Sequence, residues 1–416
     1  PFLKQPRPAG ARVCSASQRA VAHLAVLPDI EAAMLRGVAL AVLSVVGMVG
    51  ATAEVHGAKV ALFALSPIQT HGAGLALRCG ADNGAGLHNM GRFLHLQKGW
   101  SLLHWLHRRG RASIAGCLQS AAQGGGDVKR KNIAVHVTRS AETAQRKRHP
   151  WLFESDIRRL SHEGNPGDVA VVFDSKKQYL SVGLYDPYSP IRVRVLHHNE
   201  KASIDADLVS NRVRQAAMAR DGVLPADTDG FRVINGENDG LGGLVVDRYG
   251  NTLVAKFYTS AWLVWIETLT HALVDTMGAE RVVMLMSRQM QKLPPSVLMG
   301  YSHGCILHGP PLPDGVLTFV ECGITFECDP IRGQKTGFFL DQRENRMRVE
   351  KISKGMSVLN VFSYTGGFSL YAARGGASQV TSVDISTPAT EAAMRNFGLN
   401  QDLPAAGGRT VGQCRH

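Results

Sequence analysis

The chain has 416 residues and a formal net charge of +12, which makes it long enough for two or three domains and basic enough to suggest a nucleic-acid partner. Residues 1–130 hold 14 Lys and Arg against 5 Asp and Glu, so the remaining residues carry a net charge of only +3. An RNA-binding surface beyond residue 130 must therefore be a local patch. The seven cysteines form no C-x-x-C pair, which argues against a zinc site and a disulfide framework, and we expect no metal.

Residues 1–130 have few aromatic side chains and no sustained helical or strand periodicity, so they predict no domain. The apolar run at 37–53 is marginal for a bilayer span, and we expect no membrane association. The segment has features of a signal peptide but lies internally, and its low acidic content also suits a transit sequence. We interpret residues 1–130 as an unassigned extension, disordered or mistranslated. The expected location is the cytoplasm, or an organelle matrix if a transit peptide is present.

From residue 131 the pattern changes to short alternating segments bounded by turn residues. Strands are predicted at Ile133–Val137, Val169–Asp174, Tyr179–Tyr185 and Ile191–Leu196, which suggests a small β-barrel over residues 131–200. Cationic side chains and an aromatic one then occur together, as a fold needs to hold phosphates and stack a base. The RNA-binding candidates are Arg146, Lys147, Arg148, His149 and Trp151. A solvated charge run beside a core tryptophan explains the same residues.

The sequence pattern over residues 201–328 predicts an α+β domain. An amphipathic helix is predicted at 205–220, a glycine-punctuated strand pair at 231–250, a strand at 251–258, a helix at 261–277 and a strand at 281–286. A hairpin follows over 319–328, where Cys322 and Cys328 are expected to be free thiols. Glu237 and Asp239 suit turn positions beside glycine better than a metal or acid–base pair.

The stretch at 358–385 predicts a buried strand, a glycine turn, a helix and a second strand with Asp384 near its end. This is the nucleotide-binding half of a parallel α/β sheet, because the glycines allow close backbone approach and an acidic strand tip can accept ribose hydroxyls. The turn departs from the dinucleotide fingerprint, so a mononucleoside with a short carboxylate arm, such as S-adenosylmethionine, suits it better. An ordinary tight turn with a strand-end aspartate remains the alternative. Upstream, the 333–343 segment could deliver Lys335 beside the pocket, or leave it as a solvated loop charge.

Taken in order, several motifs from Ile133 to about Asn400 resemble the large-subunit ribosomal RNA cytosine-C5 methyltransferases of the large subunit methyltransferase I type. The matching segments are 148–153, 236–241 with 246–250, 333–343, and 360–368 with Asp384. The resemblance implies a multidomain α/β and α+β chain: a PUA-like barrel over 131–200, a central α+β domain over 201–328, and part of a Rossmann-like class I methyltransferase domain over 329–416.

The resemblance also implies S-adenosylmethionine as cofactor and large-subunit ribosomal RNA as partner, and it leaves a homodimer open. The cofactor would be contacted by Asn360, Phe362, Ser363, Tyr364, Gly366, Gly367 and Asp384, with Gln334, Lys335, Thr336 and Gly337 closing over the site. Arg146 to Trp151 would lie in the RNA-facing PUA module.

After Asn400 the sequence departs from the family, which continues with an acidic strand tip, a Pro-Pro strand end and a cysteine-bearing loop. We therefore expect only two strands of the methyltransferase sheet, weak or absent cofactor binding, and a chain that is inactive as given because its catalytic C-terminal part is missing. Carbon 5 of cytosine is a poor nucleophile, and the resemblance implies that thiolate attack at carbon 6 activates it. Cys414 is too close behind Asp384 and in the wrong context for this role, so no catalytic residue is assigned. The alternatives are an inactive RNA-binding protein with a vestigial cofactor site, and methylation of another base.

Overall fold

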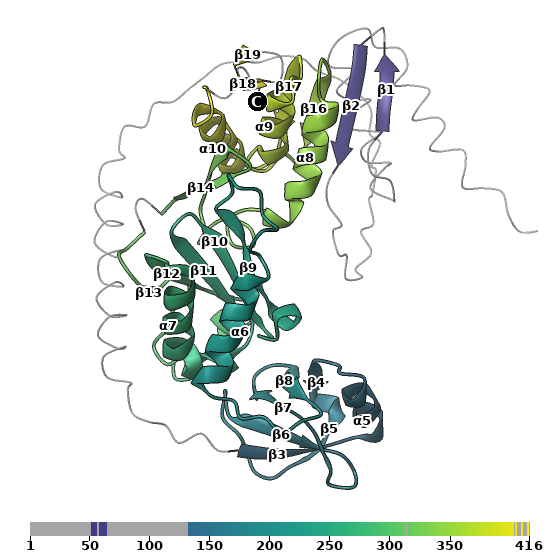
Figure 1. The fold of residues 1–416 in the computed structure, drawn as a ribbon, viewed down its shortest axis with the longest axis vertical. Helices are drawn as coiled ribbons and strands as arrows, with labels where there is room; N and C mark the ends of the chain where they lie inside the picture. Colours follow the sequence, from purple (N-terminus) through teal and green to yellow (C-terminus); the bar gives the residue numbers. More distant parts are fainter. Residues whose placement is uncertain are drawn as a thin grey trace, which may run out of the picture. The chain divides into compact units, whose positions relative to one another are not determined.

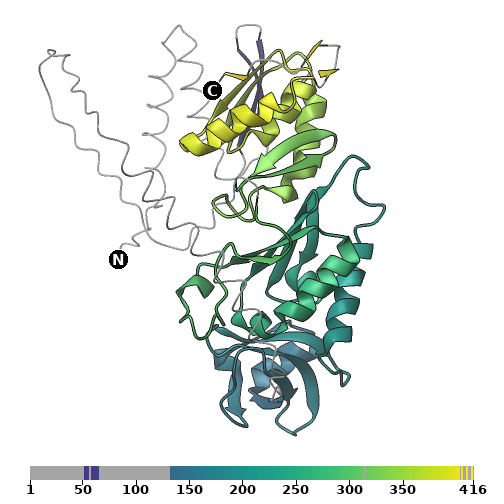
Figure 2. The same ribbon diagram turned by 90° about the vertical axis from the view of Figure 1, so that its left-hand side faces the viewer.

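The computed structural model describes residues 51–55, 58–64, 132–312, 315–402, 404–405, 409–410 and 414–415. The chain divides into two compact units, one formed by Pro1–Gly80 with Glu344–His416 and the other by Ala81–Arg343. Most of the expectations for residues 1–130 lie outside the described residues. Figures 1 and 2 show the elements in two views.

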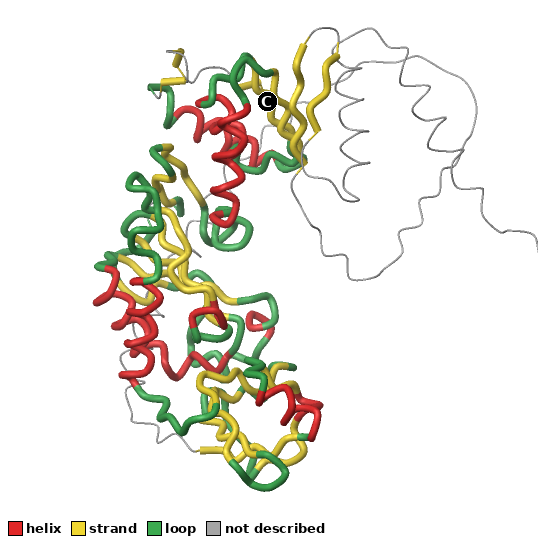
Figure 3. The backbone as a smooth tube through the Cα atoms, turned by 45° about the vertical axis from the view of Figure 1, so that its right-hand side comes forward, coloured by secondary structure: helices red, strands yellow, loops and turns green. Residues whose placement is uncertain are grey.

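The first part of the larger unit is a six-stranded sheet with the order β4-β8-β7-β6-β3-β5. Its alternating strands bury aliphatic side chains such as Ile133, Val172 and Val193 in one cluster. The bounds are β3 Asn132–Val137, β4 Trp151–Phe153, β5 Ile157–Leu160, β6 Val169–Phe173, β7 Tyr179–Tyr185 and β8 Ile191–His198. The predicted strands are present, but the sequence reading did not anticipate β4, β5 or the short helix α5 (Arg139–Arg146), which is capped by Thr138 at its N-terminus. Figure 3 shows α5 in red at the edge of these strands.

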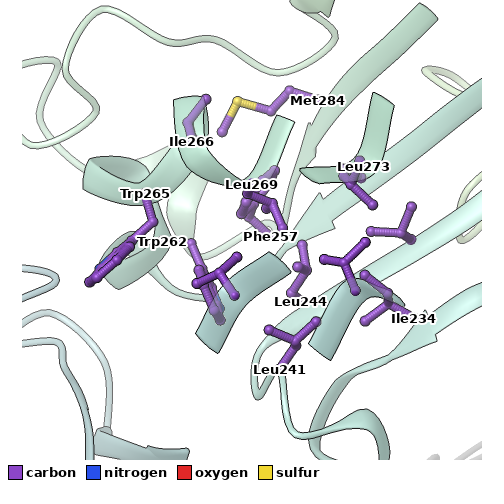
Figure 4. Close-up of a cluster of buried hydrophobic side chains, with 14 of the residues drawn as sticks. Ile234, Leu241, Leu244, Phe257, Trp262, Trp265, Ile266, Leu269, Leu273 and Met284 are labelled. Carbon is purple, nitrogen blue, oxygen red and sulfur yellow. The ribbon is translucent and has the colours of Figure 1, made fainter. Parts of the chain in front are cut away.

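The second part is a five-stranded sheet with the order β13-β12-β11-β10-β9, covered on one face by α6 and α7. Trp262, Phe257 and Leu273 lie in the large buried cluster between sheet and helices (Figure 4). The bounds are α6 Ala206–Met218, β9 Gly230–Asn235, η3 Gly236–Asp239, β10 Leu244–Tyr249, β11 Thr252–Phe257, η4 Ser260–Trp265, α7 Ile266–Met277, β12 Arg281–Met286, η5 Met290–Lys292 and β13 Ile306–His308. The predicted helix at 261–277 therefore begins as a 3-10 turn.

A hairpin of β14 (Leu317–Glu321) and β15 (Ile324–Cys328) follows this sheet. Phe319 packs edge-on against both Tyr249 and Phe338, with ring centroids 5.0 Å apart in each pair. Cys322 lies at the turn whereas Cys328 pairs with Leu317 at the far end, so the two thiols do not face one another. Both are free, as the sequence predicted, and burial raises the pKa of Cys328 well above its usual value.

Buried polar contacts join these two parts of the larger unit. The Asp186 carboxylate at the end of β7 is only 2% exposed and accepts hydrogen bonds from Thr259 Oγ1 at 2.5 Å and Ser260 N at 2.9 Å. Glu237 Oε1 accepts from Trp151 Nε1 at 2.7 Å and from Arg194 Nη1 at 2.8 Å. Both carboxylates thus tie the six-stranded sheet to the turns at one end of the five-stranded sheet.

The smaller unit is built on a sheet with the order β1-β2-β16-β17-β20, in which β2, β16, β17 and β20 run parallel. Val358, Val380 and Ala372 form its buried cluster with Val349 of α8. The bounds are β1 Ala51–Val55, β2 Ala58–Ala64, α8 Arg343–Ile352, β16 Ser357–Val361, α9 Gly367–Arg374, β17 Gln379–Val383, α10 Thr387–Gly398, β18 Pro404–Ala405, β19 Arg409–Thr410 and β20 Cys414–Arg415, whereas η6 Leu340–Gln342 belongs to the larger unit.

This sheet corrects the expectation of only two methyltransferase strands. β2, from the segment that the sequence left unassigned, pairs with β16 from Ser357–Val60 to Val361–Ala64 (Figure 1). In addition, β20 pairs with β17. Because these partners lie far along the chain or beyond the motif that was recognised, local periodicity could not reveal them.

Replacing Asp186 by Ala should lower the free energy of unfolding by about 2–3 kcal/mol, because Ser260 N and the Thr259 hydroxyl would be buried without an acceptor. Urea unfolding followed by tryptophan fluorescence measures the change. The control is Asp221→Ala at an exposed carboxylate. Equal unfolding midpoints for the two variants would show that the Asp186 contacts do not stabilise the unit.

Candidate functional site

The backbone between β16 and α9 bends sharply, because three of its residues adopt the left-handed conformation with positive φ. Phe362 has φ 61°, Tyr364 φ 48° and Gly366 φ 77°. Gly366 N donates to Ser363 O at 3.0 Å, which closes the turn directly before α9 begins at Gly367. Left-handed conformations cost energy for the two aromatic residues, and such strain is concentrated at ligand sites.

Helix α10 holds this turn in place from behind. A Cβ added to Gly366 would lie 2.9 Å from Ala393 Cβ, so a larger residue has no room there. Asn396 is fully buried, and its Nδ2 donates to Thr365 O at 2.9 Å. The sequence analysis identified the glycines but not α10, whose contacts with the turn span 27–31 residues of chain.

Asp384 links the tip of β17 to the same turn. Its Oδ2 accepts a hydrogen bond from Tyr364 N at 2.8 Å, and its Oδ1 accepts one from Ser386 N at 2.9 Å. The glycine turn and the acidic strand tip therefore meet at one edge of the sheet, as their spacing suggested. Each carboxylate oxygen can accept a further hydrogen bond, for example from a ribose hydroxyl.

Several groups around the turn are suited to a polar ligand. Ser363 Oγ and Thr365 Oγ1 are buried without a hydrogen-bond partner among the described residues. By contrast, Asn360 is occupied within the fold, because its Nδ2 donates to Ser369 Oγ at 2.9 Å. The amides at the start of α9 offer donors to a carboxylate. The turn therefore fits a nucleoside with an amino-acid arm.

Exposed apolar side chains surround Asp384. Phe362 is 59% exposed, Val383 40% and Ile385 101%. An adenine ring needs such apolar surface, and large exposed aliphatic side chains beside a strand tip are otherwise costly to leave in water. Sequence reasoning missed Val383 and Ile385, although an apolar residue on each side of a strand-tip acid was a visible signal.

The Gln334–Gly337 loop lies in the larger unit. Thr336 is buried, and its Oγ1 donates to Asp247 Oδ2 at 2.6 Å, so it supports the central sheet. Lys335 Nζ lies 2.8 Å from Asp341 Oδ1. Burial alone would raise the pKa of Asp341, but the hydrogen bond and charge of Lys335 lower it below its usual value. The carboxylate beside Lys335 is thus Asp341, and a role for Lys335 at the cofactor stays a prediction.

The RNA candidates in the six-stranded part have unlike surroundings. Lys147, Arg148 and His149 are exposed, whereas Arg146 Nη2 lies 2.8 Å from buried Asp174. Trp151 is half-buried, since its indole N–H donates to Glu237. The exposed aromatic at this place is Phe153, at 39%. A stacking role for Trp151 stays a prediction, but its contact with Glu237 gives it a structural role.

Two histidines on β8 extend this basic region and were not identified from the sequence. Burial lowers the pKa of His198, and the charges of Arg148, His197 and His149 lower it further. Its Nδ1 is buried without a partner among the described residues. A phosphate bound here would oppose this lowering, because it supplies the negative charge that the cluster lacks.

In the described part of the chain no helix is both long and apolar enough to cross a membrane. Within the same residues, no group of three or more His, Cys, Asp or Glu side chains is arranged to hold a metal ion.

The comparisons with known proteins agree with this arrangement. Residues 135–198 match a PUA-like domain family, and residues 299–407 match an S-adenosylmethionine-dependent methyltransferase family. A ribosomal RNA large subunit methyltransferase of Deinococcus radiodurans is 46% identical over 278 residues, which cover 66% of this chain and 67% of the relative. A ribosomal RNA large subunit methyltransferase I of Shewanella frigidimarina is 36% identical over 275 residues, covering 64% and 67%. Matches thus span about two thirds of these relatives' length.

Among solved structures, a protein described as a SAM-dependent methyltransferase from Streptococcus mutans superposes with a TM-score of 0.55 at 22% identity, covering 66% of this chain and 69% of that one. A methyltransferase complexed with SAH gives 0.56 at 22% identity, covering 64% and 66%. At this identity the likeness concerns the fold. The sheets and the matched families define a PUA-like domain combined with a Rossmann-like, S-adenosylmethionine-dependent methyltransferase domain. The chain belongs to the ribosomal RNA large subunit methyltransferase family, and its cofactor is S-adenosylmethionine.

Replacing Gly366 by Ala should disrupt the turn more than Gly355→Ala does. The two glycines share a similar φ, 77° and 72°, but only the Gly366 methyl group would meet another residue, Ala393. The clash should add about 1–3 kcal/mol of destabilisation. Hydrogen–deuterium exchange of peptides covering 357–374 measures it, and equal exchange rates in the two variants would contradict the close packing against α10.

Proposed function

We propose that the chain uses S-adenosylmethionine to methylate ribosomal RNA of the large subunit, at carbon 5 of a cytosine. The observation that carries the proposal is the meeting of Asp384 and the glycine turn at one sheet edge, within a domain of the methyltransferase family. The relatives are named as large-subunit ribosomal RNA methyltransferases, which supports the same substrate class here. Acting on ribosomal RNA would place the chain in the cytoplasm.

The cofactor supplies an electrophilic methyl group on a sulfonium. In the proposed arrangement, Asp384 accepts the ribose hydroxyls through the lone pairs that Tyr364 N and Ser386 N leave unused. The amides at the start of α9, from Gly367 onward, face the carboxylate of the methionine arm, and the unpartnered hydroxyls of Ser363 and Thr365 can hydrogen-bond to it or to its amino group. Phe362 and Ile385 provide apolar surface for the adenine.

Carbon 5 of cytosine is a poor nucleophile. Methyl transfer to it therefore needs a thiolate that adds to carbon 6 and so activates carbon 5. Cys328 does not suit this role, since it is buried and its pKa is raised well above the usual value. Cys305 is buried as well, with its Sγ 3.7 Å from Met284 Sδ. Methylation of a different base is the alternative within the same enzyme class.

RNA binding without methyl transfer is the second candidate function. The exposed cations Lys147 and Arg148 support it as much as they support RNA methylation, because both functions require RNA binding. Incubating the protein with radiolabelled S-adenosylmethionine and undermodified large-subunit ribosomal RNA separates the two. Label recovered in 5-methylcytidine supports the enzyme, label in another nucleoside supports the different base, and RNA binding with no label incorporated supports the binding protein.

Replacing Asp384 by Ala should weaken binding of S-adenosylhomocysteine about tenfold or more, because the ribose loses a charged acceptor and the turn loses its link to β17. Isothermal titration calorimetry measures the dissociation constant. Asp402→Ala, at an exposed aspartate, is the control for charge. An unchanged dissociation constant in Asp384→Ala would remove the proposed ribose contact.

Replacing Arg146, Lys147 and Arg148 together by Ala should weaken RNA binding and reduce the slope of log affinity against log salt by about 2–3, since each lost phosphate contact contributes about 0.7–0.9. Filter binding at several salt concentrations gives the slope. The matched control removes three other exposed cations, in Lys201→Ala, Arg214→Ala and Lys292→Ala together. If both triple variants show the wild-type slope, the cations at 146–148 do not contact RNA.

A further inference from the structure

One face of the five-stranded sheet carries a cationic cluster that the cofactor and PUA assignments do not use. Ala255 and Phe257 of β11 point into the core under α6 and α7. Side chains alternate along a strand, so Lys256 and Tyr258 point to the opposite face. Lys256 is paired with Val245 of β10, and Asp247, two residues along that strand, is paired with Arg232 of β9. These side chains therefore share one face.

This face has more positive than negative charge. Asp247 is its buried carboxylate, and it is already engaged by Arg232 at 2.8 and 3.1 Å and by Thr336 at 2.6 Å. Lys256 Nζ has a neutral partner, the Lys335 carbonyl oxygen at 2.8 Å. Burial lowers the pKa of Lys256, the charge of Asp247 partly offsets this, and the charges of Arg232 and Arg288 lower it further. Lys256 and Arg288 thus form no ion pair with any described carboxylate.

Arg288 lies close to these groups because of the strand pairing. β11 and β12 are parallel, so their carboxyl ends lie at the same edge of the sheet. Just beyond those ends, Ser287 N donates to Phe257 O at 2.9 Å. Tyr258 and Arg288 directly follow the two bonded residues. Tyr258 and Arg288 therefore follow neighbouring strand ends at this edge, and the charge of Arg288 acts on Lys256.

Tyr258 has the exposure expected of a ligand contact. Its side chain is 43% exposed, and Lys256 Nζ lies 5.8 Å from the centroid of its ring. Burial raises the pKa of Tyr258, so its hydroxyl is neutral and can donate a hydrogen bond. A half-exposed tyrosine beside Lys256 offers a ring for stacking and a positive charge for a phosphate at the same place.

The cluster also adjoins the joint with the six-stranded part. Tyr258 N donates to Gly243 O at 2.9 Å, and the next residue, Thr259, donates to Asp186 of that part.

We propose that Lys256, Tyr258 and Arg288, with Arg232 beside them, bind a nucleotide of single-stranded RNA, with the base stacked on Tyr258 and its phosphate between Lys256 and Arg288. The proposal rests on the RNA substrate argued above and adds a second contact region on the central domain. A nucleotide suits these residues better than an acidic peptide, because a polypeptide does not combine a flat ring and an anion in each unit.

The test compares three variants of the full chain in binding to a fluorescein-labelled twelve-nucleotide oligocytidylate. Tyr258→Ala removes the ring, Tyr258→Phe keeps it, and Arg288→Ala removes the outer cation. Tyr188→Ala and Lys292→Ala are matched controls, because Tyr188 is 50% exposed and Lys292 is an exposed cation four residues from Arg288. Fluorescence anisotropy gives the dissociation constants, and circular dichroism checks that each variant is folded.

We expect Tyr258→Ala to weaken binding about fivefold or more, since stacking on one aromatic ring is worth about 1–3 kcal/mol. Tyr258→Phe should stay within about twofold of wild type, and Arg288→Ala should lower the salt slope by about 0.7. If the 146–148 variant loses affinity while Tyr258→Ala and Arg288→Ala equal their controls, this second contact is wrong and the proposed function stands. If the wild-type chain does not bind RNA at all, both proposals fall.

Discussion

The cofactor assignment depends on the hydrogen bond from Tyr364 N to Asp384. It fixes the tip of β17 against the turn that leaves β16, so that an acidic group and a row of backbone amides face one place. The turn itself is strained at Phe362 and Tyr364, and α10 holds it from behind through Ala393 and Asn396. Rigid support of this kind lets a short loop bind a ligand without first paying the entropy of ordering itself.

Local patterns predicted much of the fold and part of the site. Strand β6 alternates regularly, β7 and β11 are short and almost continuously buried, and α6 carries Asp205 as its N-cap, so their positions follow from short stretches of sequence. What the sequence could not give are contacts between distant residues. Trp151 was interpreted as an RNA-stacking side chain because the sequence does not show its hydrogen-bond acceptor, Glu237, which lies 86 residues away. For the same reason β2 was not identified as the partner of β16, although the two are in register over five residue pairs.

In the larger unit several carboxylates have structural roles, whereas the proposed RNA contacts are cationic side chains. Asp186 and Glu237 accept hydrogen bonds that join its two parts. Asp247 forms an ion pair with Arg232, and Asp239 forms one with Arg220. With these carboxylates engaged in structural contacts, Lys147, Arg148 and Arg288 remain as exposed cations. The basicity of this region is therefore local, as the modest net charge beyond residue 130 required.

The central claim is that an adenosyl group binds where the glycine turn meets Asp384. A crystal structure of the chain with S-adenosylhomocysteine tests it most directly. The account predicts ribose hydroxyls within hydrogen-bond distance of the Asp384 carboxylate, and the methionine arm at the start of α9. Density for the ligand elsewhere in the chain, with Asp384 and the turn untouched, would contradict it.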